Sequence, residues 1–188
     1  MAPIELPNVT TLAADVLPDR RSLEIKIAVR RFHIFQFGAR GMMDSRKQLV
    51  ASAIISDPRG RVFAQKRTMT RRLFPGCWDL VGGHVEDNEE VIASLAREIT
   101  EETGWTLKRI VSELSTKYWS SGPQGYEERQ FIVDIDGDLR RPILEAGKVS
   151  EWLWVDRRNV ARLMENREPD DTLIFDSVLE ALDVLEKK

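Results

Sequence analysis

The sequence has a single cysteine among its 188 residues and a small formal net charge of -3. One cysteine cannot form an internal disulfide, and this indicates a reducing compartment. The slight negative charge argues against a surface that coats nucleic acid and against a polybasic membrane anchor. Residues 1–20 show no signal-peptide pattern, and no hydrophobic run approaches a membrane span. We therefore expect a cytoplasmic protein that binds neither nucleic acid nor membrane.

Hydrophobic residues make up 42% of the chain and charged residues 31%, as in an ordinary globular protein. This length suits one domain with an extension. Residues 1–45 are predicted to form an N-terminal arm with one or two extra strands between residues 23 and 37, and residues 46–188 the main domain. An added apolar strand needs a partner surface, so the extension predicts a homodimer.

Apolar alternation and turn residues predict mixed strands and helices in the main domain. The expected strands are 48–56, 61–66, 78–81, 107–119, 129–135 and 151–155, and the expected helices are 87–103, 157–165 and 172–187. Asp57-Pro58-Arg59-Gly60 is expected to form a β-turn between the first two strands. Strands joined by hairpins and interrupted by helices indicate an α+β fold or an α/β sandwich.

The helix at 87–103 has the clearest signals in the chain. Asp87 and Glu90 have the spacing of a capping box, and Gly104 stands where a left-handed C-cap belongs. We expect the apolar stripe of this helix to be Ile92, Leu95, Ala96 and Ile99.

Three glutamates on this helix predict a metal site. Glu98, Glu101 and Glu102 are three and four residues apart, so their side chains share one face of the helix. Like charges side by side repel, and Mg²⁺ or Mn²⁺ would relieve that repulsion because these ions prefer oxygen ligands. Gly82 and Gly83 precede the helix, and glycines let the backbone turn tightly and approach a ligand closely.

The same segment follows one continuous pattern. Gly83, five spacers, Glu89, seven spacers, then Arg97-Glu98-Ile99-Thr100-Glu101-Glu102-Thr103-Gly104-Trp105 reproduce the signature of the Nudix hydrolases, which the chain resembles here. A smaller aliphatic residue is usual at the position of Trp105. Weaker similarity at 64–67 and 74–78 extends the resemblance to roughly residues 49–155.

The resemblance implies a Nudix-type α/β/α sandwich with a mixed sheet, and roles for the residues of the motif. Glu98, Glu101 and Glu102 would be the metal ligands, and the carbonyl of Gly82 or Gly83 would add another. Arg97 would organise the site and pair with Glu89. The expected activity is metal-dependent cleavage of the diphosphate linkage in a small-molecule substrate, a nucleoside diphosphate linked to another group.

Other candidates lie outside the motif. Lys66, Arg67, Arg71 and Arg72 form a basic segment that could contact a diphosphate, with a solvated loop as the alternative. We take Arg67, with Gly82 and Gly83, as substrate-binding. Glu128 is the candidate for an additional carboxylate, as substrate contact, ligand or base, and Glu127, Glu145 and Glu151 compete with it. Aromatic residues that could stack on a base, or pack in the core, are Tyr118, Trp119 and Tyr126.

Two other functions compete with hydrolysis. A nucleotide-sensing module of the same fold would bind without turnover, but such modules usually lose motif glutamates. Isopentenyl diphosphate isomerases share the fold, and the segment Phe74-Pro75-Gly76-Cys77-Trp78 is similar to theirs. Their chemistry uses a cysteine shortly after that tryptophan, whereas Cys77 here precedes Trp78. The sequence therefore favours the hydrolase, and leaves its substrate and general base open.

Overall fold

A computed structural model describes residues 47–187 of the chain. The expectations for residues 1–45, including the strands between 23 and 37 and the dimer that they suggest, lie outside the described residues. None of the helices within 47–187 is long and apolar enough to cross a membrane.

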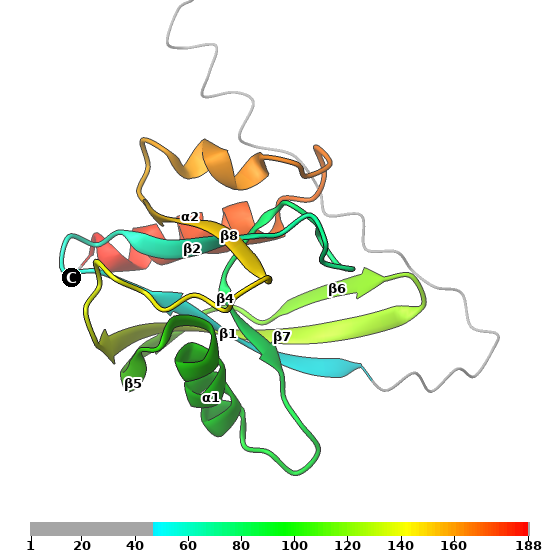
Figure 1. The fold of residues 1–188 in the computed structure, drawn as a ribbon, viewed down its shortest axis with the longest axis horizontal. Coiled ribbons are helices and arrows are strands. Elements are labelled where there is room, and N and C mark those ends of the chain that lie inside the picture. Colours follow the sequence, from blue (N-terminus) through cyan, green and yellow to red (C-terminus); the bar gives the residue numbers. More distant parts are fainter. Residues whose placement is uncertain (1–46, 188) are drawn as a thin grey trace, which may run out of the picture. The chain divides into compact units, whose positions relative to one another are not determined.

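The described part of the chain contains two β-sheets (Figure 1). The larger sheet has the order β4 (Val81–His84), β1 (Gln48–Ile55), β7 (Gln124–Asp136), β5 (Thr106–Glu113), and β6 (Lys117–Ser121) also pairs with β7. The smaller sheet has the order β3 (Trp78–Asp79), β2 (Val62–Arg67), β8 (Val149–Val155). β1 and β7 are parallel, whereas the other pairs are antiparallel, so the larger sheet is mixed.

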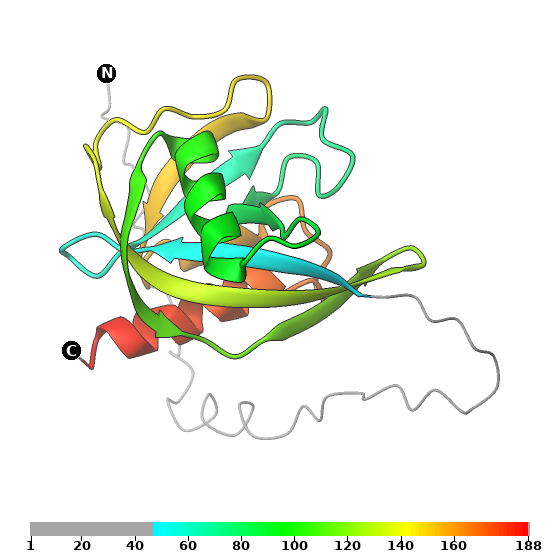
Figure 2. The same ribbon diagram turned by 90° about the horizontal axis from the view of Figure 1, so that it is seen from below.

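Two helical layers cover the sheets on opposite sides (Figures 1 and 2). Strand alternation sends neighbouring residues into different cores. Ile54 and Ile132 pack with α2 (Leu173–Leu185) and the 3₁₀ helix η3 (Val160–Met164). Ala53 and Val133, one position away in their strands, pack instead with α1 (Val91–Thr103). The architecture is therefore the expected α/β/α sandwich with a mixed sheet.

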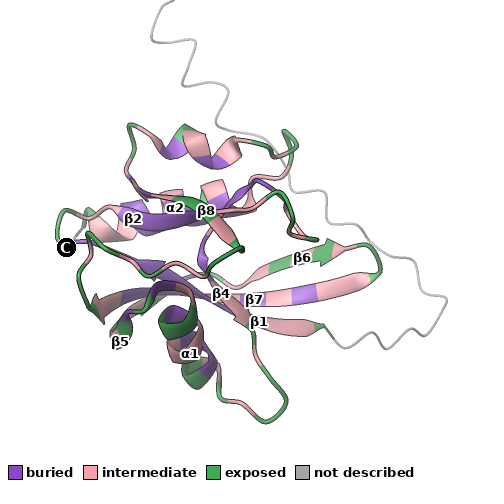
Figure 3. Ribbon diagram, in the orientation of Figure 1, coloured by how far each residue is buried: buried purple, intermediate pink, exposed green. Residues whose placement is uncertain are grey.

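Burial is concentrated in the strands that lie between the two helical layers (Figure 3). Phe63 on β2 is fully buried and contacts three tryptophan rings, Trp105, Trp152 and Trp154, with ring centroids 5.0 to 5.8 Å away. Trp105 follows the C-cap of α1, so this aromatic group fixes the end of the helix that carries the glutamates. The core therefore accommodates Trp105, which is larger than the aliphatic residue usual at this position.

Several predicted elements have different bounds in the structure. The strand expected at 78–81 is two strands, because β3 pairs with β2 in one sheet and β4 pairs with β1 in the other. The strand expected at 107–119 is interrupted after Glu113 and becomes β5 and β6. β7 begins at Gln124, five residues before the expected strand at 129, and the helix expected at 157–165 is only the 3₁₀ helix η3.

The predicted start of α1 is wrong, whereas its end is confirmed. The helix begins at Val91, with Glu90 as its N-cap residue and no side-chain capping bond, so Asp87 and Glu90 do not form a capping box. Gly104 has φ 69° and caps the C-terminus as expected. Ile92 is exposed, and the buried face consists of Ser94, Leu95, Ile99 and Thr103.

Candidate active site

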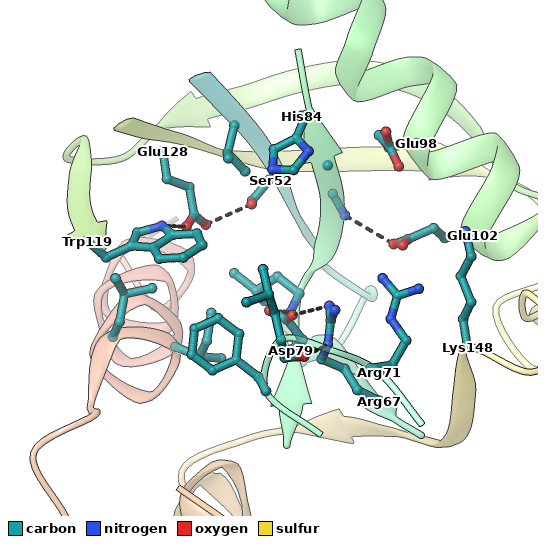
Figure 4. A pocket seen from close by; sticks show the side chains of 18 of the residues that line it. Ser52, Arg67, Arg71, Asp79, His84, Glu98, Glu102, Trp119, Glu128 and Lys148 are labelled. Carbon is teal, nitrogen blue, oxygen red and sulfur yellow. Dashed lines mark hydrogen bonds and ion pairs between the residues drawn. The ribbon is translucent and has the colours of Figure 1, made fainter. Parts of the chain in front are cut away.

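A cavity of about 540 Å³ opens where the two sheets separate. It is lined by β1, β4, β6 and β7 of the larger sheet together with α1, and by the loop 68–76 and the start of α2 (Figure 4). This is the size of cavity that holds a small-molecule ligand. Its lining includes Gly82, Gly83, Glu98 and Glu102 from the motif, together with Glu128 and Arg67.

Gly82 and Gly83 have no side chains, and this lets the carboxylate of Glu98 lie directly against the backbone of β4. A side chain at Gly83 would overlap the carboxylate of Glu98, and one at Gly82 would overlap the backbone of Ala51 and Ser52 on β1. Only glycine fits at these two positions without a shift of the neighbouring atoms. The backbone of β4 and the Glu98 side chain therefore share one corner of the cavity.

Arg97 connects the helix to the loop before it. Its guanidinium donates to both carboxylate oxygens of Glu89 at 3.0 and 3.1 Å and to Glu98 Oε1 at 2.6 Å. A further bond at 3.3 Å goes to the carbonyl of His84 at the end of β4. The bond from Arg97 is the main reason that the pKa of Glu89 falls to about 2. Arg97 thus ties α1, the loop and β4 together beside Glu98.

Glu102 is held by two donors on the same oxygen. The backbone N–H of Gly82 donates to Glu102 Oε2 at 3.1 Å, and Gln65 Nε2 donates to it at 2.7 Å. Burial raises the pKa of Glu102 to about 7, although these two hydrogen bonds lower it, and the charge of Glu98 adds to the increase. No cationic side chain within residues 47–187 pairs with Glu102, so its ionised form lacks a counter-charge there.

Glu101 lies apart from the other two motif glutamates. Its side chain is 57% exposed, lies outside the cavity lining, and its nearest charged contact is Arg97 at 3.4 Å. Within residues 47–187, no group of three histidine, cysteine, aspartate or glutamate side chains is gathered closely enough to hold a metal ion. Glu98 and Glu102 nevertheless face the cavity beside the Gly83 backbone, and carboxylate and carbonyl oxygens are the ligands that Mg²⁺ and Mn²⁺ accept. The donor set therefore fits such an ion.

The basic segment divides between the cavity and other contacts. Arg67 lines the cavity, but its guanidinium donates to Asp79 Oδ2 and to the carbonyl of Leu73, both at 2.9 Å. Arg71 also lines the cavity, and no side chain within residues 47–187 forms an ion pair with it. Lys66 pairs with Glu165 instead, and Arg72 is exposed. Lys148, which the sequence did not suggest, lies on the same side of the cavity as Arg71 (Figure 4).

Of the competing carboxylates outside the motif, Glu128 alone lines the cavity. Glu127 is its neighbour on β7 and is not in the lining, as expected for adjacent residues of a strand. Glu145 pairs with Lys148, and Glu151 pairs with Lys66 and Arg162. Trp119 lines the cavity next to Glu128, whereas Tyr118 is 60% exposed and Tyr126 is buried behind Trp119.

Four further residues of the site could not be identified from local patterns. Ser52, Gln65, Asp79 and Arg167 reach the site from three strands and the segment after η3. Ser52 bonds Glu128, Gln65 bonds Glu102, and Arg167 donates to the carbonyl of Trp78, and these contacts span 76, 37 and 89 residues of sequence. Only the fold brings these groups together. A buried polar residue in a strand of apolar neighbours, as Gln65 is in β2, is the one signal that sequence offered.

The chain matches the family model of the NUDIX domain over residues 46–176. Among curated proteins it is similar to an RNA pyrophosphohydrolase of Erythrobacter litoralis, with 26% identity over 138 residues, 64% of this chain and 83% of the relative. It is also similar to an isopentenyl-diphosphate Delta-isomerase 2 of Photorhabdus laumondii, with 27% identity over 135 residues, 70% of this chain and 75% of the relative. A MutT protein structure from Methanosarcina mazei superposes with a TM-score of 0.60 at 22% identity, covering 78% of this chain and all 100% of that one.

Proposed function

The chain belongs to the Nudix family and is a hydrolase of diphosphate linkages, and on that premise we propose that it cleaves a nucleoside diphosphate linked to another group, using Mg²⁺ or Mn²⁺. The observation that carries this proposal is that charged side chains and an aromatic side chain lie at different ends of the cavity. Glu98 and Glu102 lie at one end with the Gly83 backbone, Arg71 and Lys148 lie beside them, and Trp119 lies at the far end (Figure 4). Such a cavity suits a ligand with an anionic centre and an aromatic end.

The motif residues have two roles where the diphosphate would bind: some would hold the metal ion, and others position those ligands. Glu98 and Glu102 would hold the divalent cation with the carbonyl of Gly82 or Gly83, and Glu101, the third motif glutamate, would have to turn from its exposed position to join them. A cation held there would neutralise the charge that builds on the departing phosphate. Arg97 fixes Glu98, and the donors from Gln65 and Gly82 fix Glu102.

The reaction is an in-line displacement at phosphorus. Water forms a new P–O bond, the anhydride P–O bond breaks, and the displaced phosphate keeps the bonding electrons. The proton of the water passes to a carboxylate, for which Glu98, Glu102 and Glu128 are the candidates that line the cavity. Arg71 forms no ion pair within residues 47–187 and Lys148 pairs with Glu145; both line the cavity and would stabilise the phosphate oxygens.

The isomerase is the second candidate, favoured by the relative from Photorhabdus laumondii. Its chemistry needs a cysteine in the region of β4, and the backbone there argues against one. A side chain at Gly82 would collide with the carbonyl of Ala51 and with Ser52. Cys77 is buried and its thiol donates to the carbonyl of Asn166 at 3.1 Å, outside the cavity lining.

Turnover of a mixed panel with and without Mg²⁺ tests the proposal. The panel contains deoxynucleoside triphosphates, nucleotide sugars, ADP-ribose, NADH, dinucleoside polyphosphates and isopentenyl diphosphate. We expect hydrolysis of one nucleotide class that is lost in Glu102→Gln and kept in Glu127→Gln, its control outside the cavity. Tight Mg²⁺-dependent binding without turnover would instead identify a sensor, and conversion of isopentenyl diphosphate would identify an isomerase.

We keep three predictions that rest on the sequence alone. They are the preference for Mg²⁺ or Mn²⁺ over other ions, a homodimer formed through residues 1–45, and a cytoplasmic location. Sedimentation of the full chain beside a chain lacking residues 1–45 tests the second of them.

A further inference from the structure

Glu128 is a buried carboxylate beside Trp119, on the other side of Ser52 from the proposed metal-binding corner formed by Glu98, Glu102 and the Gly83 backbone. It is 5% exposed, yet it lines the cavity, and Figure 4 shows Ser52 and His84 between it and Glu98. A buried carboxylate is costly unless donors surround it. Within residues 47–187 no lysine or arginine pairs with Glu128, and neutral donors hold it instead.

Three donors hold this carboxylate and leave one acceptor position. Ser52 Oγ donates to Glu128 Oε1 at 2.7 Å, and Gln130 Nε2 donates to the same oxygen at 2.9 Å. Trp119 Nε1 donates to Oε2 at 2.9 Å. A carboxylate offers about four acceptor positions, so one remains, and it belongs to Oε2, the oxygen with a single donor. An N–H or O–H group of an organic ligand in the cavity can fill it.

Aromatic and aliphatic side chains surround that position. The Trp119 ring stacks on Tyr126 with centroids 3.9 Å apart and an interplanar angle of 14°, which fixes its plane. Phe74 meets Trp119 edge-on at 5.7 Å, and Leu173 and Ile174 at the start of α2 also line the cavity. A flat apolar ring suits this surface. A second phosphate does not, because it would face the charge of Glu128.

We infer that Glu128 recognises the exocyclic amino group of a nucleobase, so that the substrates are nucleotides of amino-bearing bases. The inference rests on the proposed function, because it places the diphosphate of the same molecule at Glu98 and Glu102. An exocyclic amine is planar with its ring, so a ring lying along Trp119 can present the N–H to Oε2. A base without the amine leaves the last acceptor position of a buried carboxylate unfilled.

Two nucleotide pairs that differ only in this amine test the inference. GTP is compared with ITP, and ATP with purine riboside triphosphate, by kcat/KM with Mg²⁺ and by calorimetric binding to Glu102→Gln. A hydrogen bond to a charged group predicts a preference of about tenfold or more for the amino-bearing member of at least one pair. The preference should shrink to about threefold or less in Glu128→Gln, since neutral hydrogen bonds are about half as strong.

The Glu128→Gln variant is expected to fold, and Glu127→Gln is its matched control. The introduced amide oxygen can accept from Trp119, and its NH₂ can donate to Gln130 Oε1, which has no partner among residues 47–187 in the native protein. Glu127→Gln removes the adjacent charge outside the cavity and should keep the preference. A circular dichroism melt of both variants checks folding.

The outcomes separate recognition of the base by Glu128 from a general-base role and from a substrate that is not a nucleotide. Equal kcat/KM within both pairs, or a preference that survives Glu128→Gln, overturns the inference while nucleotide hydrolysis stands. A fall in kcat by the same factor for every substrate would make Glu128 the general base and also overturns it. If no nucleotide is bound or hydrolysed but another diphosphate is, the nucleotide part of the proposed function fails together with the inference.

Discussion

Replacing Glu102 by glutamine should stabilise the protein at alkaline pH in the absence of metal. Burial raises the pKa of this carboxyl from 4.5 to about 7. Between these values the folded protein holds a proton that the unfolded chain has released, so the free energy of unfolding falls as pH rises. The cost of the ionised carboxylate is complete above about pH 7 and absent below about pH 4.5. Glutamine does not ionise and avoids it.

The expected size of the effect follows from the same pKa and from the contacts of the side chain. At 1.36 kcal/mol for each tenfold change in the proton equilibrium, the shift corresponds to about 3 kcal/mol at pH 8. Gly82 N–H and Gln65 Nε2 both donate to Oε2, so the amide oxygen of glutamine can keep both bonds. For a domain of this size we expect a Tm higher by about 6–12 °C.

Thermal melts of native protein and Glu102→Gln in EDTA at pH 5 and pH 8 measure this difference. The gap should be small at pH 5 and large at pH 8, and Mg²⁺ should narrow it by binding the native site only. Glu101→Gln is the control, because that side chain is 57% exposed and should change stability by no more than about 0.5 kcal/mol. A Glu102→Gln protein no more stable than the native one at pH 8 would refute the reasoning.

Three further predictions concern the residues around the metal-binding corner. Gln65→Met removes a hydrogen bond that orients Glu102 and should weaken Mg²⁺ activation by about 10–100-fold, measured as the Mg²⁺ concentration for half-maximal rate; an unchanged value would contradict this role. Arg97→Lys cannot bond both Glu89 and Glu98 and should lower kcat/KM by about tenfold or more, whereas native activity would mean that the network is structural only. Glu98→Gln should weaken Mg²⁺ activation more than Glu101→Gln, because Glu98 faces the cavity; the reverse order would show that Glu101 is the stronger ligand.

The layers of the fold could be predicted because their signals are local. The apolar runs of β1 and β2 and the turn at 57–60 depend on neighbouring residues, and so does the left-handed C-cap at Gly104. The start of α1 could not be predicted, because Glu89 bonds Arg97 eight residues later and its Oε2 accepts from the N–H of Glu86. A tertiary contact therefore keeps residues 86–90 out of the helix, against their spacing.

The motif identified one corner of the site, and the sheets supply the rest. Glu98, Glu102 and the two glycines are close in sequence, so a linear pattern contains them. Trp119 and Glu128 meet because β6 and β7 pair antiparallel, with Trp119 opposite Tyr126. Arg67 was expected to bind substrate, and its bonds to Asp79 and Leu73 depend on the path of the loop 68–76. Such choices of partner are decided by the fold and cannot be read from spacing.

Turnover in water enriched in ¹⁸O tests the central claim most directly. If water attacks phosphorus with a divalent metal held by Glu98 and Glu102, one phosphate product of the best substrate will carry a single ¹⁸O atom. The label should be absent in EDTA and in Glu102→Gln, and should return when Mg²⁺ is restored to the native protein. Label in a product that is not a phosphate, or metal-independent labelling at the native rate, would contradict the account.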